Sequence, residues 1–103
     1  MSAEEPPLTA VFARAERMVG RRIADQFLLV PIVSRGADVD ALFNLNRVGT
    51  FIWERLDGAT PGSRIVDALV AHFDVVRDQA EADYRSFLAS LVEIKAVEVV
   101  AGP

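Results

Sequence analysis

The sequence has no cysteine and only one histidine among its 103 residues. Without cysteine the chain can form neither a disulfide nor a thiolate zinc site. A zinc site built around the single histidine, His72, would depend on carboxylates, which suit that metal poorly. His72 stands beside Phe73 in a segment with helical apolar spacing, so we expect a partly buried structural role for it. No metal site is predicted.

Long apolar segments are also absent. The longest apolar run, Phe27–Val33, contains Pro31 and is far too short to cross a bilayer. The first residues, Met1–Pro7, are acidic and proline-rich and lack the basic start and apolar stretch of a secretion signal. We therefore expect a cytoplasmic protein that does not enter a membrane.

Positive charge is scarce in the second half of the chain. The net charge is −4, and residues 1–50 hold six acidic and six basic residues, so the whole acidic surplus follows residue 50. The expected last helix carries more acids than bases: Glu81, Asp83 and Glu93 against Arg85 and Lys95. A DNA-recognition helix needs the opposite balance. Neither nucleic acid nor an anionic membrane is an expected partner.

Recognisable catalytic groups are missing as well. The serines have no evident partner base, and no nucleophile elbow occurs. The glycine-containing run Gly58–Gly62 lacks the lysine and the spacing of a phosphate loop. The acids Asp78, Glu81 and Asp83 stand at an expected helix start, where the helix dipole accounts for them. We expect no catalytic residue and no cofactor, and thus no enzyme.

The length allows one domain with one core. Residues 1–17 are expected to be a tail or a short helix, because apolar positions keep helical spacing over Leu8–Met18. Three strands follow in the pattern, at Val19–Ile23, Phe27–Val33 and Ala41–Leu45. Short links between them predict an antiparallel meander.

Three helices are predicted after these strands. Asn46 is a favourable N-cap for the first helix, and Asp57–Gly58 would end it with glycine at C′. Thr60–Pro61 would begin the second helix as N-cap followed by proline at N1. Asp78 and Glu81 stand in capping-box spacing for the third.

The last element is a short strand or tail at Val97–Val100. The order of elements favours an α+β domain, with the helices packed on a small antiparallel sheet. Trp53 stands beside Ile52, off the centre of the apolar stripe of the first helix. A core position is favoured for this tryptophan, and a partner anchor is the alternative.

One series of positions is specific when its order and spacing are taken together, although no single position in it is. It comprises Leu45–Asn46, Ile52–Trp53, Leu56–Gly58, Thr60, Ile65, Leu69, Phe73, Asp83, Phe87–Leu88 and Leu91. Each is a helix cap or a core position when taken alone. Together, over roughly residues 19–100, they resemble the PqqD-like family.

The resemblance implies a winged-helix-like domain over residues 18–100, with a three-stranded antiparallel sheet followed by three helices. Members of the family bind the leader of a ribosomally made precursor peptide and present it to a modifying enzyme, often a radical SAM protein. The implied partners are thus a precursor peptide and a radical SAM maturase. The pathway would be pyrroloquinoline quinone (PQQ) biosynthesis or a related one.

The same resemblance implies a binding site. In the family the leader adds as a strand to the third strand of the sheet, beside the third helix. The implied peptide-binding residues are Ala41, Leu42, Phe43, Asn44, Leu45, Tyr84, Arg85, Leu88 and Val92. Independently, an exposed strand edge offers unpaired amides and carbonyls to an extended peptide. Such binding needs no catalytic residue.

Two other functions stay open at this stage. One is an acidic winged-helix domain that regulates or binds another protein and has no part in peptide maturation. The other is a structural subunit that forms a homodimer through its edge strand.

Overall fold

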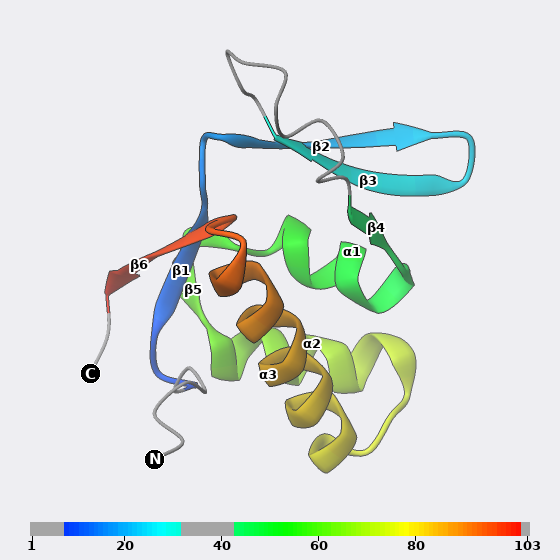
Figure 1. Cartoon of the computed structure of the whole chain (residues 1–103). Coiled ribbons are helices and arrows are strands. Elements are labelled where there is room, and N and C mark those ends of the chain that lie inside the picture. The colour runs from blue at the N-terminus through cyan, green and yellow to red at the C-terminus, as the bar shows by residue number, and fades with distance from the viewer. Residues whose placement is uncertain (1–7, 32–42, 102–103) are drawn as a thin grey trace.

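The computed structural model describes residues 8–31 and 43–101. Over these residues the chain forms six strands and three helices, arranged as two three-stranded sheets with the helices packed between and below them (Figure 1). The strand orders are β2-β3-β4 and β5-β1-β6. The predicted α+β class is confirmed.

The first sheet is the predicted meander. β2 (Met18–Ile23) pairs with β3 (Gln26–Pro31) along its whole length, and β3 pairs with β4 (Phe43–Leu45), all antiparallel. The hairpin of β2 and β3 extends above α1 in Figure 1. The remaining residues predicted for these strands, Ile32–Val33 and Ala41–Leu42, lie outside the described residues.

The second sheet was not predicted as a sheet, although a short strand or tail was expected at Val97–Val100, where the strand β6 lies. β1 (Val11–Arg14) lies where a short helix was expected, and that prediction is wrong. β1 is the central strand, with β5 (Asp57–Pro61) on one side and β6 (Val97–Ala101) on the other. A short apolar segment fits both the helical and the strand period. Here pairing with two distant segments makes the segment a strand.

The first helix, α1 (Arg47–Glu54), begins as predicted and ends early. Asn46 is its N-cap, and the Asn46 side-chain oxygen accepts the Gly49 amide at 2.7 Å. The predicted ending at Asp57–Gly58 is wrong, because the helix already ends at Glu54, with Arg55 as its C-cap. Gly58 has a φ of 81° within β5, so glycine is needed there for the strand and not for the helix.

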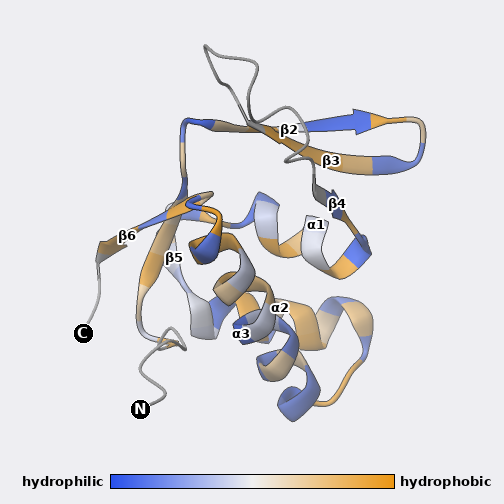
Figure 2. Ribbon diagram, in the orientation of Figure 1, coloured by the Kyte–Doolittle hydropathy of each residue, from blue (hydrophilic) through white to orange (hydrophobic). Residues whose placement is uncertain are grey.

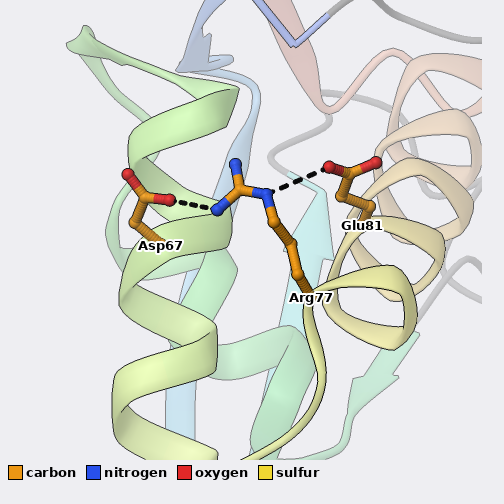
Figure 3. Close-up of polar contacts among 3 residues, drawn as sticks. All are labelled: Asp67, Arg77 and Glu81. Carbon is orange, nitrogen blue, oxygen red and sulfur yellow. Dashed lines mark hydrogen bonds and ion pairs between the residues drawn. The ribbon is translucent and has the colours of Figure 1, made fainter.

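The predicted caps of the other helices are also wrong. α2 (Gly62–Phe73) has Pro61 as its N-cap, one residue after Thr60. α3 (Arg77–Glu93) follows Val76 and has no side-chain cap. Glu81 binds Arg77 Nε at 3.2 Å instead of closing a capping box, and Arg77 also contacts Asp67 of α2 (Figure 3). These contacts tie the start of α3 to α2.

One apolar core joins both sheets and all three helices. Its largest fully buried side chains are Tyr84, Leu29, Ile52, Leu56, Ile65, Leu69, Leu88 and Val66. Trp53 is 3% exposed and belongs to this core, which confirms the favoured reading of that residue. Figure 2 shows hydrophobic colours along β1 and much of β3, whereas the arrow end of β2 is hydrophilic. In the described part of the chain no helix has the length and apolarity to span a membrane.

Candidate functional site

The outer edge of β4 is unpaired within the described residues. β4 pairs with β3 through Leu29–Phe43, Leu28–Asn44 and Phe27–Leu45, and no other strand of the described residues lies on its far side. Alternate amides and carbonyls of an edge strand point away from its neighbour, where a further strand can bond to them. The edge of β4 is therefore a place for an extended peptide.

A short capped turn fixes this strand against α1. The Asn46 side chain accepts the Gly49 amide, and the Thr50 hydroxyl donates to the Asn46 carbonyl at 2.8 Å. A single residue, Asn46, separates the end of β4 from the start of α1. The strand edge and the first turn of the helix are held as one unit.

A hollow of about 290 Å³ lies beside this unit, between the start of α1 and one flank of α3. It is lined by Asn46, Val48, Gly49, Asp83, Ser86, Phe87 and Ser90. We refer to it as the α1/α3 hollow. A Cβ at position 49 would come within 3.0 Å of the Phe87 ring. Glycine there lets the two helices approach.

The chemistry of the α1/α3 hollow is mixed. The half-buried Phe87 and Val48 provide apolar surface, while Asn46 and the two serines provide hydrogen-bonding groups. Asp83 accepts a hydrogen bond from Gln79 at 2.8 Å, which orients its carboxylate. Apolar surface with a few polar groups suits a side chain of a bound peptide.

The implied peptide-binding residues are distributed over several environments. Phe43, Asn44 and Leu45 form β4, whereas Ala41 and Leu42 lie outside the described residues. Tyr84 and Leu88 are 0% exposed and belong to the core. Arg85 and Val92 lie on the flank of α3 turned away from the α1/α3 hollow, as the helical period of 3.6 residues requires.

The residues of α3 that face the hollow were missed by sequence reasoning. They are Asp83, Ser86, Phe87 and Ser90. The stripe Ala80, Tyr84, Leu88 and Leu91 is the buried face, and the hollow lies along the next row of side chains. Phe87 is the sequence feature that could have indicated this row of α3, because it is a large apolar residue with serines one position before and three positions after it.

Tyr84 has an unusual environment for a polar side chain. Its hydroxyl is buried and has no hydrogen-bond partner among the described residues, and burial raises the pKa of Tyr84 to about 12. The ring packs against the first residue of α2, since a Cβ at Gly62 would lie 2.7 Å from the Tyr84 hydroxyl. Tyr84 therefore packs α3 against α2 and offers no surface to a ligand.

His72 is exposed, so the predicted partial burial is wrong. Its ring stacks on Phe51 with 4.7 Å between ring centroids, and the Arg55 guanidinium lies 3.4 Å from the Phe51 centroid. These contacts are structural. In residues 8–31 and 43–101 no group of three or more histidines and carboxylates could hold a metal ion.

Comparison with known proteins gives two matches. The family model described as Coenzyme PQQ synthesis protein D (PqqD) matches residues 34–97, which is more than half of the chain. A solved structure titled "TbiB1 in Complex with the TbiA(beta) Leader Peptide" is similar with a TM-score of 0.68 and 29% sequence identity. That similarity covers 84% of this chain and 94% of the other. None of the curated proteins matches.

Proposed function

The chain belongs to the PqqD family, and from this premise we propose that it binds the leader of a ribosomally made precursor peptide. The leader adds as an extended strand to the open edge of β4, next to the α1/α3 hollow. Main-chain hydrogen bonds to β4 set the register of the peptide. The hollow takes one of its side chains and supplies discrimination.

The observation that carries this proposal is the open edge of β4 beside the α1/α3 hollow. It is supported by the similarity to a structure that was solved with a leader peptide and that aligns with most of this chain. Tyr84 and Leu88 act from the core by holding α3 in place, and Ser86, Phe87 and Ser90 contact the peptide.

The proposed role ends at recognition and presentation. With its leader on β4, the precursor keeps its modifiable segment free for a separate modifying enzyme, which we propose to be of the radical SAM type. The chain itself carries out no chemical step. A short segment bound through one strand and one side-chain site would reach a low-micromolar dissociation constant, or about −8 kcal/mol.

A pair of substitutions tests the site. Ser90→Tyr fills the α1/α3 hollow from an exposed position, and Ala71→Tyr makes a similar change on an exposed position of α2. A candidate precursor is sought among short reading frames beside this chain's gene, and binding of its synthetic leader is measured by calorimetry. We expect Ser90→Tyr to weaken binding about tenfold or more, and Ala71→Tyr to leave it unchanged. Equal affinities of the two variants would contradict the site.

A further inference from the structure

The α1/α3 hollow contains one charged group. Of the residues that line it only Asp83 carries a charge, and Asp83 is half-buried. Arg47, at the start of α1, lines a separate hollow on the other flank of that helix. No lysine or arginine of the described residues lines the α1/α3 hollow. The carboxylate therefore makes the hollow negative.

Within the described residues Asp83 has no cation to neutralise it. Glu81, two positions earlier, binds Arg77 (Figure 3), whereas Asp83 forms no ion pair. Oδ1 of Asp83 accepts the hydrogen bond from Gln79, and Oδ2 accepts none from the described part of the chain. Asp83 is also the seventh residue of α3, beyond the first turn in which the helix dipole favours an acid. The dipole, which was expected to account for this acid, does not account for it.

An aromatic ring lies one helical turn from this carboxylate. Phe87 is four positions after Asp83, and Ser86 and Ser90 are three and seven positions after it, so the four share one row of α3. A guanidinium group is flat, stacks on aromatic rings and binds a carboxylate through two parallel hydrogen bonds. The ring and the carboxylate together fit both properties of that group.

The charge of α3 as a whole also favours a cation. The helix contains four acids and two bases. One of these bases, Arg77, is bound to Asp67 and Glu81, and the other, Arg85, lies on the flank turned away from the hollow. A surface of one charge sign raises the local concentration of groups with the opposite sign.

We propose that the α1/α3 hollow binds an arginine of the leader, with the guanidinium stacked on Phe87 and hydrogen-bonded to the carboxylate of Asp83. This inference rests on the proposed function and names the side chain that the hollow selects. The hydroxyls of Ser86 and Ser90 accept hydrogen bonds from the remaining N–H groups. Asp83 then determines specificity, because a neutral or acidic leader side chain would cover the carboxylate and leave it unpaired.

A double-mutant cycle between the leader and Asp83 tests the pairing. In the synthetic leader each arginine is replaced in turn by citrulline, which keeps the shape of the side chain and removes its charge. We expect one of these replacements to weaken binding about tenfold or more in calorimetry, because hydrogen bonds between charged groups are lost. Asp83→Asn should weaken binding of the parent leader by a similar factor. In that variant the same citrulline replacement should have little further effect.

The variants allow matched controls. Asp83→Asn keeps Oδ1 as an acceptor for Gln79, so it changes the charge and little else. Glu93→Gln removes one negative charge from an exposed position of α3 outside the hollow, and it should leave the affinity for the leader unchanged. Lysine in place of the critical arginine should restore only part of the affinity, since an ammonium group cannot bind the carboxylate through a planar fork.

The outcomes separate this inference from the proposed function. A leader that binds but contains no arginine, or whose citrulline variants all bind as tightly as the parent, would overturn the arginine site and leave the peptide site standing. Equal affinities of Asp83→Asn and Glu93→Gln for the parent leader would do the same. A leader that does not bind at all would contradict the proposed function and this inference together.

Discussion

Tyr84 reports on the packing of α2 against α3. The chain has one tyrosine, so the ultraviolet absorbance of tyrosinate follows Tyr84 alone during an alkaline titration. Because burial raises the pKa of Tyr84 to about 12, we expect the folded protein to titrate there and the urea-unfolded chain to titrate at about 10. Titration at the same pH in both states would contradict the burial of this side chain.

The same shift has a consequence for stability. Tyr84 keeps its proton to a higher pH in the folded protein than in the unfolded chain. Its contribution to the free energy of unfolding is therefore complete below pH ~10 and is lost as the pH rises toward ~12. Tyr84→Phe should lack this alkaline loss. At neutral pH that variant should be as stable as the unsubstituted chain or more so, because it removes a buried hydroxyl that has no partner in the described part of the chain.

At the scale of elements, the end of α3 contains backbone strain that one substitution could relieve. The amide of Ala96 bonds the carbonyl of Leu91 at 2.8 Å, and the amide of Lys95 bonds that of Val92 at 3.0 Å. These are the two bonds of a Schellman ending, in which the residue at C′ is left-handed and usually glycine. Lys95 occupies that position with a φ of 61°.

Lys95→Gly should therefore stabilise the fold by about 1 kcal/mol, because a Cβ is unfavourable in the left-handed region. Urea unfolding measures the change as a higher midpoint at an unchanged slope. Lys95→Ala is the control, since it removes the same charge and keeps the Cβ. A gain in Lys95→Ala equal to that in Lys95→Gly would show that the charge, and not the backbone, is responsible.

Elements were predictable from the sequence where local signals decide them. The strands of the meander follow from apolar runs between turns, and Asn46 is a cap whose bond lies within one helical turn. β1 depends instead on β5 and β6, which lie 43 or more residues further along the chain. Such pairing leaves no local pattern, so Val11–Arg14 was predicted as part of a helix.

The candidate site was predictable only in part, for a related reason. The position of β4 follows from the chain order and from the resemblance to the family. Which row of α3 faces the α1/α3 hollow depends on how α3 is rotated against the core. Apolar residues along α3 indicate the buried row and not the row beside the hollow. Tyr84 and Leu88 were therefore predicted to bind the peptide in place of Ser86 and Phe87.

At the scale of the whole molecule, the proposed peptide site lies at the outer edge of one of the two sheets. That edge is β4, whereas the sheet β5-β1-β6 packs on the same core. The core lies between them and joins Phe12 and Val97 of one sheet to Leu29 of the other. The strand proposed to bind the precursor is therefore supported by the core that also packs the second sheet.

The most direct test of the peptide site is a titration of isotope-labelled chain with its leader, followed by amide chemical shifts. We predict that the largest shifts occur at Asn44 and Leu45 of β4 and at Ser86, Phe87 and Ser90 of α3. Outward-facing amides of β4 should also exchange more slowly with solvent when the peptide is bound. Shifts that cluster on residues 60–75 and leave both β4 and this row of α3 unchanged would contradict the account.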